Sequence, residues 1–102
     1  MSKQQIPLKD VPQQTVDVVY GAITFYFSFR WLAAGQMYVD ISLADGTVLR
    51  QGRACLPQQF LLGELANAPA GVDFYFVDIT GNEAPVDYPG VGTRWVLLQV
   101  TE

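Results

Sequence analysis

Histidine is absent from the 102 residues of this chain, and cysteine occurs once, as Cys55. A Ser-His-Asp triad, a Cys-His pair and the common zinc sites all need residues that the sequence lacks. A single cysteine has no partner for an internal disulfide, which excludes a secreted disulfide scaffold. No charged residue adjoins Cys55 in the sequence, and we expect it to be a small buried hydrophobe.

Charged residues are also scarce, at 16% of the chain against about 25% in typical globular proteins. The net charge is −4, and no basic stripe is available to neutralise phosphates, so nucleic acid is not expected as a partner. The N-terminus lacks the apolar core of a signal peptide, and no apolar run approaches the ~20 residues of a membrane helix. We therefore expect a soluble protein made in a cytoplasm, without a membrane partner.

What the sequence does have is apolar side chains: half of the residues are hydrophobic and 13% are aromatic. Two explanations are open. A small β domain with two apolar layers needs such a composition, or part of the apolar surface meets a partner. The length suits one domain with one sizeable core, and we expect residues 1–102 to form a single β domain.

Alternation of apolar and polar residues with a period of two dominates the chain and predicts β-strands. Residues 15–20 and 23–31 are expected to form a hairpin, and residues 37–43 and 47–53 a second one around a turn of the Asp-Gly type. Together these segments predict a four-stranded meander. Residues 72–79 and 93–100 are predicted to be further strands.

The predicted fold is all-β, a small single-domain barrel or sandwich of about six or seven mostly antiparallel strands. Residues 1–14 are expected to form an extended arm that lies along a sheet edge or a neighbour, or stays unpaired. Residues 80–92 are expected to form a long exposed loop, and residues 54–71 an irregular connection whose leucines, including Leu65, close the core. The predicted core contains Phe25, Phe27, Phe29, Val39, Ile41, Val77 and Leu97, and the two tryptophans, Trp31 and Trp95, are expected to pack with it.

Catalytic and metal chemistry has little support in the loop that follows residue 79. Asp78, Glu83 and Asp87 are three acids that could hold a hard cation, but their spacing lacks the pattern of a calcium loop. Gly90 and Gly92 resemble the start of a phosphate-binding loop, yet a β-type run follows them instead of a helix. We interpret these glycines as a sharp turn into the last strand. No catalytic, metal or cofactor site is expected, and the chain is predicted not to be an enzyme.

Two strands are apolar on both faces. In residues 72–79, Tyr75 and Val77 alternate with Phe74 and Phe76, and the last strand behaves in the same way. Either these strands lie between two packed layers or one face meets another subunit. On the second interpretation, Phe74, Phe76, Val96 and Leu98 form one flank that Tyr26 and Tyr38 extend. The candidate partner contacts are therefore Tyr26, Tyr38, Phe74, Phe76, Arg94, Val96 and Leu98.

The order of several short motifs resembles the cyanophage baseplate plug-like family of small tail proteins. From about Ile6 onward these are "IPL…VPQQ", "FRW…MYVDI", "LADGTVL" with its following "QG", "LLG", "FYFVDITGN" and "GVGTRWVLLQV". Each motif is common alone, whereas their order and spacing are fairly specific.

The resemblance implies a structural component of the tail baseplate of contractile-tailed bacteriophages, at or near the central hub, where it closes or connects the tail-tube end. It implies partners among the other baseplate proteins (hub, tube, spike or tape-measure protein), assembly in the host cytoplasm, and no enzymatic site. A homo-oligomer is left open. The alternative hypothesis is a small β-barrel that binds a peptide or small ligand without catalysis, and an enzyme that uses carboxylates alone ranks third.

Overall fold

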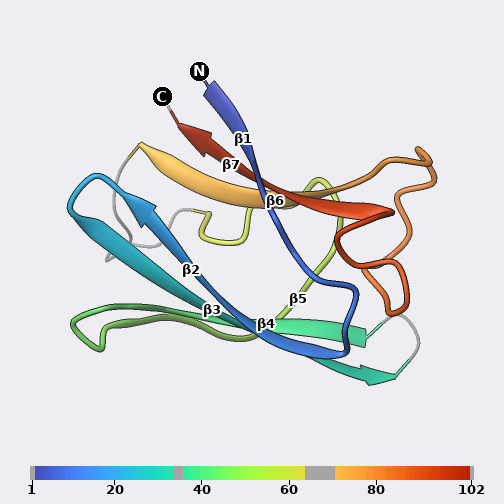
Figure 1. The fold of residues 1–102 in the computed structure, drawn as a ribbon, viewed down its shortest axis with the longest axis horizontal. Coiled ribbons are helices and arrows are strands. Elements are labelled where there is room, and N and C mark those ends of the chain that lie inside the picture. The colour runs from blue at the N-terminus through green and yellow to red at the C-terminus, as the bar shows by residue number, and fades with distance from the viewer. Residues whose placement is uncertain (1, 34–35, 64–70, 102) are drawn as a thin grey trace.

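The computed structural model describes residues 2–33, 36–63 and 71–101. These residues form seven strands in two antiparallel sheets (Figure 1), so the predicted all-β fold is confirmed. In chain order the strands are β1 (Ser2–Ile6), β2 (Gln13–Tyr20), β3 (Ile23–Ala33), β4 (Gln36–Leu43), β5 (Val48–Ala54), β6 (Val72–Asp78) and β7 (Trp95–Thr101). Within these ranges no helix is long and apolar enough to span a bilayer.

The larger sheet is the predicted meander, with strand order β2-β3-β4-β5. Phe27, in the middle of β3, lies opposite Val16 of β2 and Ile41 of β4, so the inward residues of three strands adjoin. The pairing shifts at β5, because Val39 faces Arg53 while Ile41 faces Arg50. Two residues of β5 therefore face one residue of β4, which is a β-bulge.

The smaller sheet has the order β1-β7-β6, and its middle strand is the last one in the chain. Ser2 of β1 lies opposite Thr101 of β7, and Ile6 lies opposite Leu97, so the two chain ends lie side by side (Figure 1). Residues 2–6 of the predicted arm thus form an edge strand. Pro7 follows β1 directly, as expected for a residue that cannot donate to a ladder.

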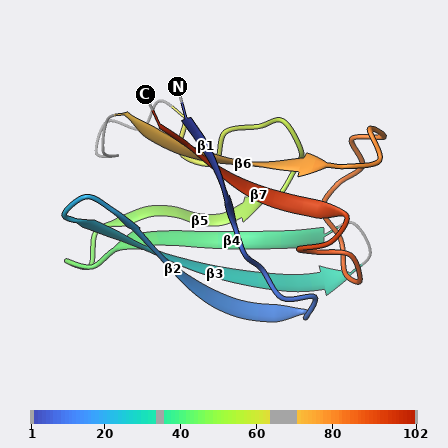
Figure 2. The ribbon, with the colours of Figure 1, turned by 45° about the horizontal axis from the view of Figure 1, so that its top comes forward.

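The two sheets form separate layers that face each other (Figure 2), and neither closes into a barrel. Phenylalanine rings fill the space between them. The Phe74 ring lies 5.2 Å from that of Phe25 and 4.7 Å from that of Phe27, both edge to face, and Phe76 lies 6.0 Å from Phe29. The fold is therefore a two-layer sandwich with an aromatic core.

Most of the predicted core is confirmed. The fully buried residues include Phe25, Phe27, Phe29, Val39, Ile41 and Leu97. The prediction for Val77 is wrong, because this residue is half-buried on the outer side of β6. The inward positions of β6 are Val72, Phe74, Phe76 and Asp78. Both faces of β6 are apolar, so alternation alone does not tell which face points inward.

The connection from β5 to β6 is irregular, as expected, and its described part covers one end of the core. Leu61 and Leu62 are both fully buried. The Leu61 amide donates to the Phe74 carbonyl over 2.8 Å, which fixes this segment along β6. Leu65, which was expected to join these leucines, lies outside the described residues.

The remaining core candidates behave as small or aromatic hydrophobes. Cys55 is buried, and burial raises the pKa of its thiol above the usual range, so the thiol stays protonated and is a poor nucleophile. Trp95 is buried in the core, and Trp31 packs against its margin. These placements confirm the expected packing of Cys55 and of both tryptophans.

The accessible surface of the protein is 5619 Å², close to the roughly 5,700 Å² of an average folded monomer of this mass. The chain is therefore about as compact as an average monomer of its mass, and its buried hydrophobic side chains lie between the two sheets and at the ends of the sandwich. An interaction surface has to be sought among the side chains that remain outside these layers.

Candidate interaction surfaces

The seven candidate contact residues do not form one surface. Phe74 and Phe76 are completely buried between the sheets. In the pairing of β6 with β7, Tyr75 lies opposite Leu98 and Phe76 opposite Leu97, so Phe76 and Leu98 point to opposite sides of the sheet. The predicted flank of Phe74, Phe76, Val96 and Leu98 is therefore wrong, because it joins residues from two faces.

Val96 and Leu98 lie on the outer face of the smaller sheet. Val77 is the cross-strand neighbour of Val96, and Tyr75 is that of Leu98; all four side chains are half-buried. Two exposed residues adjoin these strands: the Phe60 ring packs 5.6 Å from that of Tyr75, and Ile79 directly follows β6. We call this set, Phe60, Tyr75, Val77, Ile79, Val96 and Leu98, the outer apolar patch.

Tyr26 and Tyr38 lie on the opposite side of the sandwich, on the outer face of the larger sheet. Tyr26 stands between Asp17 and Ser42, and Tyr38 stands opposite Arg30. The expectation that these tyrosines extend the flank of Val96 and Leu98 is wrong, because the whole core separates the two faces. Whether any of these outward residues contacts a partner remains a prediction.

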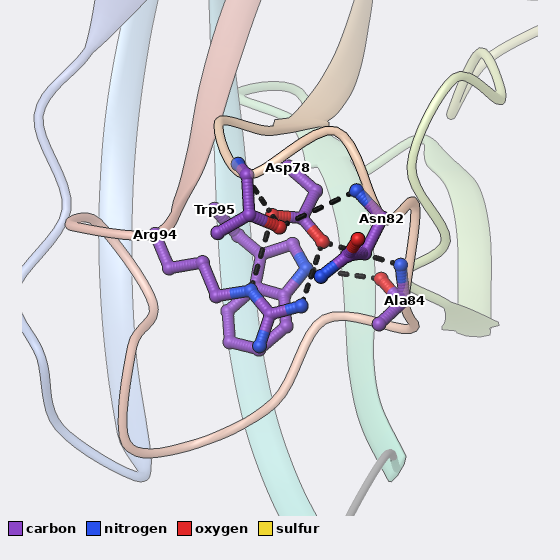
Figure 3. Close-up of polar contacts among 6 residues, drawn as sticks. Asp78, Asn82, Ala84, Arg94 and Trp95 are labelled. Atoms are coloured by element: carbon purple, nitrogen blue, oxygen red, sulfur yellow. Dashed lines mark hydrogen bonds and ion pairs between the residues drawn. The ribbon is translucent and has the colours of Figure 1, made fainter.

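Arg94 is engaged inside the loop that joins β6 to β7 (Figure 3). Its Nε and Nη2 atoms donate to the two carboxylate oxygens of Asp78 over 3.0 and 2.9 Å. The guanidinium also lies 4.3 Å from the Trp95 ring centroid, and the Trp95 indole N–H donates to the Ala84 carbonyl over 3.0 Å. Arg94 thus fastens the start of β7 to the end of β6.

Asp78 is the centre of this network. Its side chain is fully buried, and it accepts hydrogen bonds from the Thr80 amide and hydroxyl and from the Ala84 amide. The Arg94 guanidinium and these donors hold the pKa of the Asp78 carboxyl well below its usual range, although burial opposes them. Sequence reasoning missed the pair. The signal was an acid at the last position of one strand and an arginine just before the next.

The three acids considered as metal ligands serve other roles or stand apart. Asp78 is saturated by the donors named above, and Asp87 Oδ1 accepts a 2.7 Å hydrogen bond from the Trp31 indole N–H. Glu83 is exposed. In the part of the chain that the structure describes, no three His, Cys, Asp or Glu side chains are grouped so as to hold a metal ion.

The Asp78 network predicts a pH dependence of stability. Because the pKa of Asp78 is lower in the folded chain, its contribution is complete above the unfolded-state pKa of about 4 and is lost as the pH falls toward the folded-state value. We expect Asp78→Asn to be less stable at neutral pH and to lose less further stability on acidification. Urea midpoints at about pH 6 and about pH 3 measure this. The control is Asp17→Asn, at an exposed position on β2. Its urea midpoint should fall between the two pH values by as much as that of the wild type.

The turn before β7 contains the two glycines singled out in the sequence. Gly90 and Gly92 have φ values of +128° and +85°, and β7 begins three residues after Gly92. The N-terminal connection packs here, since the Gly90 amide donates to Asp10 over 2.8 Å and a Cβ on Gly92 would run into the Leu8 carbonyl oxygen. The interpretation as a sharp turn into the last strand is confirmed.

The loop as a whole is less exposed than expected. Val86 and Val91 are completely buried, and Ala84 and Tyr88 pack against the core. The loop therefore closes one end of the sandwich. Asp78, Asp87 and Arg94 are bonded within the fold, and the outer sheet faces remain as the candidate interaction surfaces.

Comparison with known proteins identifies the family of this chain. No curated protein matched the chain. The family model described as cyanophage baseplate Pam3 plug gp18 matches residues 3–102, which include both sheets and the loop between β6 and β7. The chain therefore belongs to the cyanophage baseplate Pam3 plug gp18 family, whose members are structural proteins of the phage tail baseplate.

Proposed function

We propose that this protein acts as a plug at or near the central hub of the baseplate, where it closes or connects the end of the tail tube. Family membership supports the baseplate role. On this proposal the chain works without catalysis, is assembled with hub, tube and neighbouring proteins in the host cytoplasm, and docks through the outer apolar patch.

The outer apolar patch is chosen as the docking surface because the outer faces of the two sheets differ in polarity. The face of the larger sheet is mainly polar and includes Thr15, Asp17, Ser28, Arg30, Asp40 and Ser42. The face of the smaller sheet instead presents Val77, Val96 and Leu98, and its polar side chains include Gln5 beside Leu98 and Lys3 over the Tyr75 ring, both on β1. A sheet face that meets water is normally polar, so an apolar outer face supports a covering partner.

The double variant Val96→Ser, Leu98→Ser tests the proposal. Both side chains are half-buried on the outer face, so we expect the variant to fold with a cooperative unfolding transition. Incorporation into tails should fall at least about tenfold, because the two truncations together remove buried aliphatic surface worth about 2 kcal/mol. The measurement is the amount of the protein in tails purified from a host that supplies the variant to phage lacking the gene.

Two control variants distinguish loss of the docking contact from loss of folding. Val19→Ser with Val48→Ser removes exposed apolar side chains, 66% and 52% accessible, from the larger sheet, and should leave incorporation unchanged. Phe76→Ser, on the inner face of β6, should lose the fold altogether. Normal incorporation of the Val96, Leu98 variant would rule out the outer apolar patch as the docking surface.

A further inference from the structure

Two arginines on β5, Arg50 and Arg53, form no ion pair with any carboxylate that the structure describes. Arg30 pairs with Asp40, and Arg94 pairs with Asp78. Across residues 2–33, 36–63 and 71–101, no ion pair involves Arg50 or Arg53. These two arginines flank the β-bulge in β5, so a pair of positive charges occupies one short stretch of a chain whose net charge is −4.

Backbone carbonyls hold both guanidinium groups in place. Arg50 donates from Nε to the Leu61 carbonyl and from Nη2 to the Leu62 carbonyl, each over 3.0 Å. Arg53 donates from Nη2 to the Phe60 carbonyl over 3.2 Å. Neutral carbonyls orient the guanidinium groups but leave their charge in place, and each arginine keeps N–H donors that these bonds do not use.

The segment that supplies the carbonyls is itself fixed. The chain passes there from the larger sheet to the smaller one (Figure 2), and amides of the segment bond to carbonyls of β6. Asp73 accepts from the Leu62 and Gly63 amides over 3.0 Å each. The arginines are thus preorganised on a rigid support, which lowers the entropic cost of binding an anion.

The guanidinium groups border an open hollow of about 320 Å³. The rest of its lining is uncharged: Gln51, Gly52, Ala54, Leu56 and Gln59. The Phe60 carbonyl binds Arg53 while the Phe60 ring packs on Tyr75 of the outer apolar patch, so this residue links the hollow to the patch.

We propose that Arg50 and Arg53 form a carboxylate-binding site for an acidic side chain of a neighbouring baseplate protein. The inference rests on the proposed function and adds a charged contact beside the apolar one. The Leu61 and Leu62 carbonyls occupy the Nε–Nη2 edge of Arg50, and the N–H groups that Arg50 and Arg53 keep can pair with the two oxygens of a carboxylate. Nucleic acid is a poorer fit, because neutralising the successive phosphates of its backbone takes a row of cations that this acidic chain lacks.

An NMR titration of the isolated protein with hexaglutamate tests the site. We expect shifts of the Gln51, Gly52 and Gln59 amides and of the arginine Nε–H signals. Arg53→Gln should weaken binding about tenfold or more, as loss of a charge-assisted hydrogen bond implies. Lys9→Gln, which removes an exposed cation of the N-terminal connection, should bind hexaglutamate as the wild type does.

Three results would overturn the site: no shifts at these positions, equal binding by Arg53→Gln, or binding of inorganic phosphate without binding of hexaglutamate. Urea unfolding of Arg53→Gln, which should match the wild type, excludes a trivial loss of fold. The titration uses the isolated chain, so a negative result would overturn the arginine site without bearing on the tail-incorporation test of the outer apolar patch. A negative incorporation test would likewise not change the titration result.

Discussion

Replacing Phe27 with alanine is expected to lower the free energy of unfolding by about 3–5 kcal/mol. Phe27 is almost completely buried in the middle of β3, with its ring 4.7 Å from that of Phe74 and 5.9 Å from that of Phe29. Its removal leaves a cavity between two sheets that are both held by their own hydrogen bonds. The surroundings therefore have little freedom to collapse, and the loss should lie near the upper part of that range.

Denaturant titration of Phe27→Ala beside Asp45→Ala gives the matched comparison. Asp45 lies exposed in the turn between β4 and β5 and accepts a hydrogen bond from the Thr47 amide over 2.9 Å. Its loss should cost only about 1 kcal/mol or less. Equal and small effects of the two substitutions would contradict the assignment of Phe27 to the core.

Gly92→Ala is expected to destabilise the fold by about 2–5 kcal/mol, through two independent effects. Gly92 has a φ of +85°, a conformation that alanine adopts only with strain. The added methyl group would also collide with the Leu8 carbonyl oxygen. Backbone cannot move aside as a flexible side chain can, so the N-terminal connection has to shift away from the loop.

Gly81→Ala separates strain from collision. Gly81 lies in the same loop with a nearly equal φ of +80°, but a Cβ there would meet nothing within 4 Å. The Gly81→Ala substitution should therefore lower the free energy of unfolding by about 1 kcal/mol, which is the cost of backbone strain alone. Urea titration of both variants measures the difference. If the two alanine variants were equally stable, the contact between Leu8 and the loop would have no energetic role.

Strand identity in the larger sheet was predictable because one face of each strand is polar. Residues 23–31 place Phe25, Phe27 and Phe29 on one side and Thr24, Tyr26 and Ser28 on the other, which fixes both the strand and its inward face. The resemblance to the baseplate plug family came from the order of short motifs and is confirmed by the family match.

The inward face of β6 was not predictable by the same means. Phe74 and Phe76 on one side compete with Tyr75 and Val77 on the other, so hydrophobicity supports either orientation. Only the partner layer decides between them, because the rings of β3 interlock with Phe74 and Phe76. The error moved two core residues into the proposed contact surface.

Contacts between residues far apart in the sequence were also not predictable from the sequence. β1 has little apolar alternation, and its place at the sheet edge follows from pairing with the far end of the chain. Arg94 was predicted to be a partner contact, because its actual partner, Asp78, lies 16 residues earlier in the sequence. Such pairs depend on which strands become neighbours, and local periodicity carries no information about that.

A reconstruction of the tail tip of a phage that carries this protein tests the central claim most directly. The claim predicts the sandwich on or near the tail axis among hub and tube proteins, with Val77, Val96 and Leu98 covered by a neighbouring chain. A tail tip without this protein, or one in which the outer face of β6 and β7 lies open to solvent, would contradict it.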